Sequence, residues 1–150
     1  MKPFLVILGG PNLALLGLRE PEIYGSTTWV ELEEMCSGWA KDLGIRISFL
    51  QTDSEGELVS QIGKWGSVAD GLILNAAAYT HTSIAVRDAV SAVSSPVVEL
   101  HLTNPAARED FRKRNLLEDV AVAGIRGFGV QGYRLAMDGL VQILSGVGKD

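Results

Sequence analysis

The chain has 150 residues and a formal net charge of −5 at pH 7, with 47% hydrophobic and 21% charged residues. This length suits one domain with one hydrophobic core, and the composition is typical of a globular protein rather than a disordered one. The acidic balance disfavours nucleic acid as a partner but leaves room for a small anionic ligand beside local arginines, and no apolar run approaches the roughly 20 residues that cross a bilayer.

The first elements follow from apolar runs and helix caps. Residues 3–9, PFLVILG, are a continuous apolar run and predict a buried strand. A signal peptide is the other interpretation of such a run, and the polar residues that follow disfavour it because they offer no cleavage site. Residues 26–44 predict a helix with Ser and Thr caps and a glycine stop. Its apolar residues at near-helical spacing are Val30, Leu32, Met35, Trp39 and Leu43. The lone cysteine, Cys36, falls inside this helix, which excludes an internal disulfide, favours a packed unreactive thiol, and suggests a reducing cytoplasm.

The same strand and helix unit then recurs. Further strands are predicted at residues 45–51, 70–75, 96–101 and 120–125, and further helices at 54–69, 80–94, about 106–114 and 129–146. Such alternation predicts parallel strands joined by right-handed crossovers. The expected fold is one α/β domain over residues 1–150, a flavodoxin-like doubly wound sheet of five parallel strands in the order 2-1-3-4-5, with five helices.

This strand order predicts where a ligand binds. Doubly wound sheets bind ligands at the carboxyl ends of their strands, near the switch between the first and third strands. The loops at that edge are residues 9–25, 75–83 and 101–109. These loops also contain the polar residues that are hardest to explain as scaffold.

The two histidines, His81 and His101, each follow a predicted core strand. A lone histidine in such a place is more often a hydrogen-bonded structural residue, and that interpretation stays open. Glu99 and His101 are two residues apart on one strand, so their side chains share a face and the carboxylate can orient the imidazole. A histidine held in this way is a candidate general acid or base.

Several other kinds of site are disfavoured. The chain lacks the HExxH and paired-cysteine spacings of zinc sites, the GxSxG elbow of serine hydrolases, and the phosphate loop of flavodoxins that bind FMN. The glycines of AGIRGFGVQG match neither a Walker loop nor a dinucleotide fingerprint. We expect them to allow tight packing between the fifth strand and the last helix.

Arg19 and Tyr24 stand in the charged segment GLREPEIYGSTT, residues 17–28. A phenol titrates near pH 10 in isolation, so a tyrosine is a poor base at neutral pH unless a neighbouring cation stabilises its phenolate. An exposed tyrosine packed on its own loop beside a solvated arginine is the alternative, and the pattern does not exclude it. Pro11, Pro21 and the bounding glycines indicate defined conformations, which is typical of a lid over residues 17–26.

An ordered set of motifs resembles one family across nearly the whole chain, the type II 3-dehydroquinate dehydratases, also called type II dehydroquinases. The motifs are GPNL, LG.REPEIYGSTT, DSEGEL, LN..AYTHTS.A.RDA, PVVE.H..N, AREDFR and GFG.QGY. The resemblance implies a lyase that converts 3-dehydroquinate to 3-dehydroshikimate by anti elimination through an enolate, without metal, cofactor or Schiff base. The reaction serves both the shikimate pathway of aromatic amino acid biosynthesis and quinate breakdown.

The resemblance also implies catalytic roles. Tyr24 would abstract the C2 proton, and Arg19 would favour its phenolate. Asn12 would help to stabilise the enolate oxygen, through a water molecule, as an oxyanion-type dipole. His101, oriented by Glu99, would protonate the departing C1 hydroxyl.

Substrate-binding residues are implied in the same way: Asn75, His81, Arg112, and the backbone around Leu102 and Thr103. Arg112 would face the ligand carboxylate, a partner that suits a guanidinium. Asp88 is similar to the family residue that reaches a neighbouring subunit's active site. The family's assembly, trimers combined into a dodecamer, is therefore the expected homo-oligomer.

The sequence departs from the family at Ala76 and Ala77, where Pro-Gly or Ala-Gly is usual. Two rival functions are a flavodoxin-like module that binds a small anion without turnover and a purely structural assembly subunit. The presence of Arg19, Tyr24 and His101 together argues against both.

Overall fold

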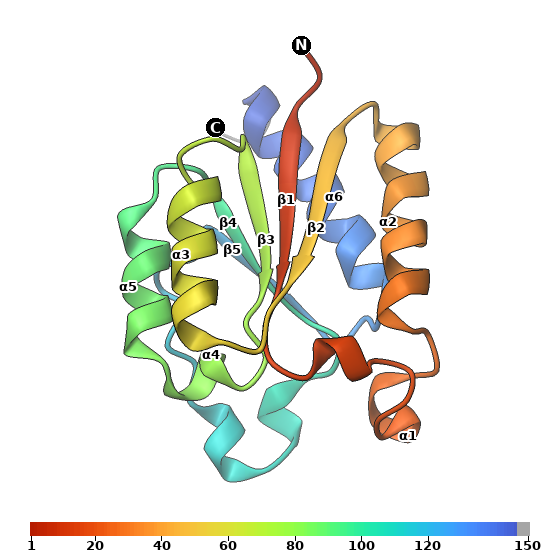
Figure 1. The fold of residues 1–150 in the computed structure, drawn as a ribbon, viewed down its shortest axis with the longest axis vertical. Helices are drawn as coiled ribbons and strands as arrows, with labels where there is room; N and C mark the ends of the chain where they lie inside the picture. The colour runs from red at the N-terminus through yellow and green to blue at the C-terminus, as the bar shows by residue number, and fades with distance from the viewer. Residues whose placement is uncertain (147–150) are drawn as a thin grey trace.

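The computed structural model of the protein describes residues 1–146. Residues 147–150, which the sequence prediction included in the domain, lie outside the described residues. One parallel sheet has the strand order β2-β1-β3-β4-β5, and Figure 1 shows β1 near its centre. The strands are β1 (Phe4–Gly9), β2 (Arg46–Gln51), β3 (Gly71–Asn75), β4 (Val97–His101) and β5 (Ala123–Arg126). The predicted flavodoxin-like order is confirmed.

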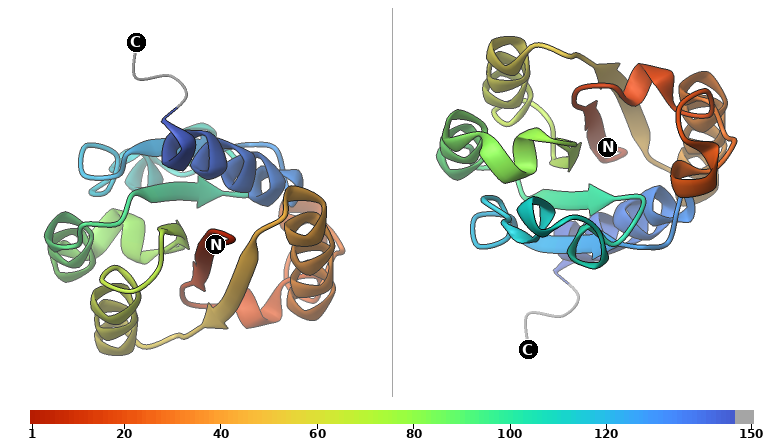
Figure 2. Two further views of the ribbon diagram at one scale, coloured as in Figure 1. Left: turned by 90° about the horizontal axis from the view of Figure 1, so that it is seen from above. Right: turned by 90° about the horizontal axis from the view of Figure 1, so that it is seen from below.

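Helices cover both faces of the sheet, as the two views of Figure 2 show. The long helices are α2 (Trp29–Leu43), α3 (Glu55–Trp65), α5 (Ile84–Ala92) and α6 (Gln131–Ser145). Side chains of β1 alternate between two cores, because successive residues of a strand point to opposite faces. Leu5 and Ile7 pack with α2 and α6, whereas Val6 and Leu8 pack with α3 and α5. No helix within residues 1–146 is long and apolar enough to cross a membrane.

The start and end of α2 follow the predicted cap chemistry. Thr28 and Glu31 form a capping box, in which each side chain accepts a hydrogen bond from the other residue's backbone N–H. Gly44 ends the helix in the left-handed conformation, with φ of 67°. Strand and helix ends elsewhere differ modestly from the predictions: α3 ends at Trp65, and β5 begins at Ala123.

The predicted apolar stripe of α2 is wrong at Val30, which is 63% exposed. The buried stripe runs instead through Leu32, Cys36 and Ala40, which recur every four residues. Val30 precedes Leu32 by two positions and so lies on nearly the opposite side of the helix. Cys36 is fully buried, as predicted, and burial, with a smaller contribution from Glu33, raises the pKa of its thiol to about 12.

Two predicted helices are interrupted, so the prediction of five helices is wrong. The segment 80–94 is divided into α4 (Tyr79–Thr82) and α5, because Ser83 is extended and its hydroxyl accepts a hydrogen bond from the backbone N–H of Val86, which caps α5. The segment 106–114 forms two 3₁₀ turns, η2 (Pro105–Ala107) and η3 (Asp110–Lys113), separated by an extended Arg108.

The expected packing role of the late glycines is also wrong for two of them. Gly127 and Gly129 have φ of 88° and 60°, and added β-carbons there would meet no atom closer than 3.9 Å. Their left-handed backbone turns the chain between β5 and α6. A close approach occurs instead at Gly10, where a β-carbon would lie 2.7 Å from the carbonyl oxygen of Ala76. This contact brings the loop after β1 against the loop after β3.

Candidate active site

A pocket of about 720 Å³, counting the space at its mouth, lies at the carboxyl ends of β1, β3 and β4. This is the switch point that the strand order predicts, at the lower end of the molecule in Figure 1. The first loop contributes two short elements, η1 (Leu13–Leu15) and α1 (Pro21–Tyr24). The predicted site residues that line the pocket are Asn12, Arg19, Tyr24, Asn75, His81, His101, Leu102, Thr103 and Arg112.

Two predicted site residues do not line the pocket. Glu99 is buried in β4 behind His101. Asp88 is exposed on α5, away from the pocket of its own chain. A contact of Asp88 with the site of a neighbouring subunit stays a prediction.

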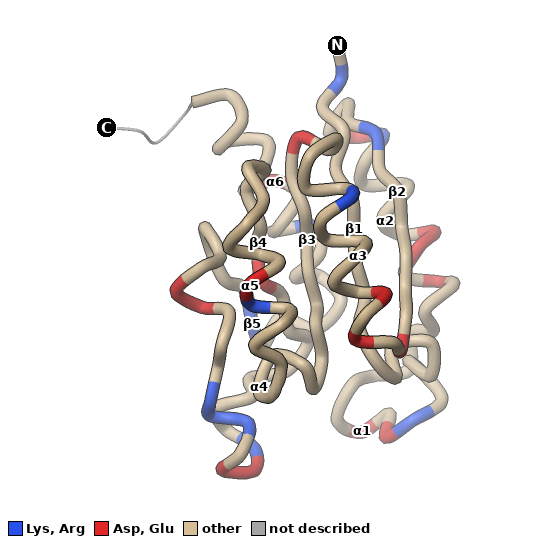
Figure 3. Tube along the Cα trace, turned by 60° about the vertical axis from the view of Figure 1, so that its left-hand side comes forward, with Lys and Arg blue, Asp and Glu red and all other residues tan. Residues whose placement is uncertain are grey.

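The pocket lining is basic although the chain is acidic, and the carboxylates that pair with its arginines, Glu20 and Glu109, stand outside the lining. Its lining includes Arg19, Arg108 and Arg112, and among the described residues no Asp or Glu side chain lines it. Figure 3 shows basic residues, beside acidic ones, in both α1's segment and the segment between β4 and β5, at the same end of the molecule. A pocket of this kind attracts a small anion.

Asn12 is held in a left-handed conformation, with φ of 68°. Its backbone N–H donates to Oδ1 of Asp53 at 2.9 Å, and the Gln51 amide donates to the same oxygen at 2.9 Å. The Tyr79 hydroxyl donates to the backbone carbonyl of Asp53 at 2.7 Å. Residues after β2 and β3 therefore fix the Asn12 loop, although Asp53 and Tyr79 were not among the predicted site residues.

Tyr24 lies beneath two guanidinium groups. The guanidinium carbon of Arg19 is 5.6 Å from the centroid of the Tyr24 ring, and that of Arg108 is 5.1 Å away. The one-turn helix α1 begins with Pro21 and brings Tyr24 back towards Arg19, as the turn at Pro21 predicts. The sequence prediction missed Arg108, which stands four residues before Arg112 in the motif AREDFR.

Tyr24 is the tyrosine whose phenol is available to a ligand. Of the three tyrosines, it alone lines the pocket. Tyr133 is fully buried in α6, where burial raises the pKa of its phenol. The Tyr79 hydroxyl is engaged with Asp53.

The tautomer of His81 follows from its hydrogen bond. Its Nδ1 lies 2.7 Å from the backbone carbonyl oxygen of Arg114, and a carbonyl only accepts. Nδ1 therefore carries the proton, and Nε2 of the neutral ring is an acceptor. Burial lowers the pKa of His81, and the hydrogen bond to Arg114 opposes this with a smaller effect. The lowered pKa favours the neutral ring.

His101 is the last residue of β4, and its ring stacks on that of His81 with centroids 6.5 Å apart. Its Nε2 lies 3.3 Å from Oε1 of Glu99, as expected for side chains two residues apart on one strand. Both side chains are more than nine-tenths buried. The carboxylate can therefore stabilise a protonated imidazole at the inner wall of the pocket.

Arg112 and Asn75 each keep polar groups free of the contacts that orient them. Arg112 donates from Nε to Glu109 at 2.8 Å, so its terminal nitrogens remain for a ligand. The Asn75 amide oxygen accepts from the Ala77 backbone N–H at 3.1 Å, so its NH₂ group is the donor, with one hydrogen for the buried Tyr133 phenol and the other for a ligand. Within residues 1–146, no three or more His, Cys, Asp or Glu side chains gather in a way that could hold a metal ion.

Comparison with known proteins agrees with this geometry. The family model described as dehydroquinase class II matches residues 3–141. The chain belongs to this family. It is 54% identical over 136 residues to a 3-dehydroquinate dehydratase of Dinoroseobacter shibae, covering 91% of each chain. It is 48% identical to a 3-dehydroquinate dehydratase of Campylobacter hominis, covering 93% of this chain and 90% of the relative.

Solved structures of the family share the fold. The crystal structure of a type II dehydroquinase from Butyrivibrio crossotus superposes with a TM-score of 0.91 at 35% identity, covering 93% of this chain and 98% of the other. That from Propionibacterium acnes has a TM-score of 0.89 at 35% identity, covering 97% and 98%. Family membership disfavours the alternative of a flavodoxin-like module that binds a small anion without turnover.

Proposed function

We propose that this protein dehydrates 3-dehydroquinate to 3-dehydroshikimate by anti elimination through an enolate. The observation that carries the proposal is one positive pocket lined by both the phenol of Tyr24, beneath the guanidinium groups of Arg19 and Arg108, and the Glu99-backed imidazole of His101. A base and an acid on one ligand are what an elimination of water requires.

In the first step, the Tyr24 phenolate removes the C2 proton of the substrate, and the electron pair moves towards the ketone oxygen to form an enolate. The guanidinium groups of Arg19 and Arg108, which lie over the Tyr24 ring, supply positive charge beside the proton acceptor. Asn12, held by Asp53, stabilises the enolate oxygen by a preorganised dipole.

In the second step, the enolate expels the C1 hydroxyl, and His101 gives it the proton with which it leaves as water. The product is a conjugated enone. Glu99, 3.3 Å from His101, stabilises the protonated imidazole before the transfer. Tyr24 takes one proton from the substrate and His101 gives one proton to the departing hydroxyl, so these two transfers balance the reaction.

The remaining pocket residues bind the substrate. Arg112 presents terminal guanidinium nitrogens to the carboxylate. The Asn75 NH₂ group donates to the substrate, His81 accepts from a hydroxyl through Nε2, and Leu102 and Thr103 contribute backbone groups.

The segment 17–26 acts as the lid that brings Arg19 and Tyr24 over the substrate. The observation that supports this lid is the strained backbone of Glu20, which has a φ of 41° immediately before α1.

We propose also that Asp88 reaches a neighbouring subunit's site in a dodecamer of trimers. The enzyme works in the cytoplasm, in the shikimate pathway or in quinate breakdown. Light scattering after size exclusion tests the assembly.

The direct test of the activity is to mix the purified protein with 3-dehydroquinate and follow the ultraviolet absorbance of the enone. Turnover at catalytic enzyme concentration, insensitive to borohydride added with the substrate, is the expected result. Absence of any absorbance increase at micromolar enzyme would leave the binding module as the better interpretation.

A further inference from the structure

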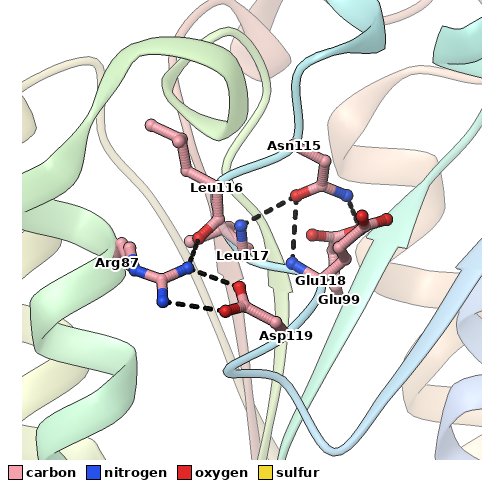
Figure 4. A network of polar contacts seen from close by, with 7 residues as sticks. All are labelled: Arg87, Glu99, Asn115, Leu116, Leu117, Glu118 and Asp119. Carbon is pink, nitrogen blue, oxygen red and sulfur yellow. Dashed lines mark hydrogen bonds and ion pairs between the residues drawn. The ribbon is translucent and has the colours of Figure 1, made fainter.

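Glu99 has a second partner besides His101. Its Oε1 accepts a hydrogen bond of 2.7 Å from the side-chain NH₂ of Asn115, as Figure 4 shows. Asn115 lies in the segment between η3 and β5, which the sequence prediction did not include in the site. It does not line the pocket. The side chain of Asn115 therefore acts on the pocket through Glu99, whereas the backbone of its neighbour Arg114 holds His81.

The orientation of the Asn115 amide is determined by the backbone around it. Its Oδ1 accepts from the backbone N–H groups of Leu117 at 2.8 Å and Glu118 at 3.1 Å. Backbone N–H groups only donate, so the oxygen must face them and the NH₂ group must face Glu99. The amide is thus a fixed donor to a carboxylate that is more than nine-tenths buried.

The segment that carries Asn115 is tied to both α4 and α5. Arg87 of α5 donates to the backbone carbonyl of Leu116 at 2.7 Å and pairs through both of its terminal nitrogens with Asp119. The backbone N–H of Leu116 donates to the carbonyl of Thr80 in α4 at 2.9 Å. Figure 4 shows the contacts of Arg87 on one side of Asn115 and Glu99 on the other. The fold therefore holds the amide at a defined place behind the pocket.

We propose that Asn115 is a positioning residue for the proton donor. By holding Oε1 of Glu99, it keeps the carboxylate 3.3 Å from Nε2 of His101, where it stabilises the protonated ring. The inference rests on the proposed role of His101 as the acid. On β5, the residue in register with Glu99 is Gly124, which has no side chain that could compete with Asn115 as a donor.

The decisive variant is Asn115→Asp, which keeps an oxygen for the N–H groups of Leu117 and Glu118 but faces Glu99 with a second carboxyl. We expect kcat at about pH 8 to fall roughly tenfold to a hundredfold, as loss of a hydrogen bond to a charged group predicts. KM should stay within about twofold, because Asn115 does not line the pocket.

The variant should recover as the pH falls. Two adjacent carboxylates repel each other, so the pair takes up a proton at a higher pH than one carboxylate alone. Acidification to about pH 5.5 therefore restores a donor towards Glu99 and raises kcat relative to that of the unsubstituted protein. The titratable and charged groups around Glu99 and Asn115 are His101 on the same strand and His81 from α4, with Arg112 from η3 acting on His81. On the segment of Asn115 itself they are Glu118 and the pair of Asp119 with Arg87 from α5. All of these groups are present in both proteins, so the ratio of kcat values reports the introduced carboxyl.

Two further variants separate positioning from general damage to the segment. Asn115→Ala removes the donor without supplying a titratable one, so its kcat should fall without recovery in acid. Asp119→Asn alters the Arg87 pair on the same segment but leaves the amide in place. Because the Asp119 side chain is 64% exposed, we expect this control to retain near-normal kcat.

An unchanged kcat in Asn115→Asp, or a ratio to the unsubstituted protein that does not vary with pH, would overturn the proposal. Nitrogen-15 NMR of the His101 ring gives a readout that does not need activity. Its resonances should move in Asn115→Asp but not in Asp119→Asn, and equal spectra in the two variants would also overturn it. Lack of turnover by the unsubstituted protein would refute the proposed function instead.

Discussion

Replacing Ala77 by glycine should stabilise the protein, whereas glycine at a second partly buried alanine, Ala89, should destabilise it. Ala77 has φ of 50°, in the left-handed region, and the Asn75 side chain holds its backbone N–H there. Ala89 lies within α5. The same atoms are removed at both positions, but backbone strain is relieved at only one.

The magnitudes follow from the two backbone conformations. A left-handed conformation costs an alanine about 1–2 kcal/mol, and this cost vanishes for glycine. Glycine loses about 0.5–1 kcal/mol more backbone entropy on folding. The net change for Ala77→Gly is therefore a stabilisation of about 0.75 kcal/mol, the middle of a range of roughly 0–1.5 kcal/mol. Ala89→Gly should destabilise by about 0.5–1 kcal/mol, because a helical alanine has no strain to release.

Urea denaturation measures both changes. All proteins should be compared at one protein concentration, because assembly would add concentration-dependent stability. In thermal melts, the Ala77→Gly transition should rise by about 1–4 °C. If Ala77→Gly destabilises the protein as much as Ala89→Gly does, the inference of strain at this pocket residue is wrong.

Further predictions concern binding and pH. Arg112→Lys should raise KM about tenfold and change kcat less, since a lysine cannot hold a carboxylate through two parallel hydrogen bonds; steady-state kinetics checks this, and an equal KM would remove Arg112 from substrate binding. Cys36 should resist thiol reagents in the folded protein, because burial raises its pKa to about 12. The buried neutral thiol makes its full contribution to the free energy of unfolding below about pH 8.5, the ordinary pKa of an unfolded cysteine. As the pH rises from there towards 12, the free energy of unfolding falls by about 1.4 kcal/mol per pH unit, because the unfolded chain releases this proton first. Urea denaturation from pH 8 upward should show this slope reduced in Cys36→Ala; an equal slope would contradict it. His81 has the opposite sign, since its lowered pKa means that the unfolded chain binds the proton first. Stability should therefore fall as the pH drops below about 6.5, more steeply than in His81→Asn.

Periodicity and cap chemistry predict most of the sheet and its helices. The apolar run PFLVILG predicts a strand buried on both faces, which is β1, and the Thr28 cap and Gly44 stop bound α2 as local rules require. The strand order then brings three loops to one edge, so the pocket's place was predictable before any side chain was placed.

The errors arise where a local cap or a tertiary contact overrides the periodic pattern. Ser83 interrupts a helical periodicity because its hydroxyl caps α5. Arg108 is extended between two 3₁₀ turns and lies over Tyr24, a contact with a residue far away in the sequence. Asn115 meets Glu99 across the fold, and no spacing between them signals it.

The central claim is tested most directly by measuring how fast the substrate's C2 hydrogen exchanges with deuterated water. NMR monitors this exchange in the presence of His101→Ala or of Tyr24→Phe. Proton abstraction by Tyr24 precedes loss of the hydroxyl, so His101→Ala should catalyse exchange while forming little enone. Tyr24→Phe should bind the substrate but catalyse neither exchange nor dehydration. Exchange that persists in Tyr24→Phe would contradict the assignment of the base and, with it, the proposed enolate route through this pocket.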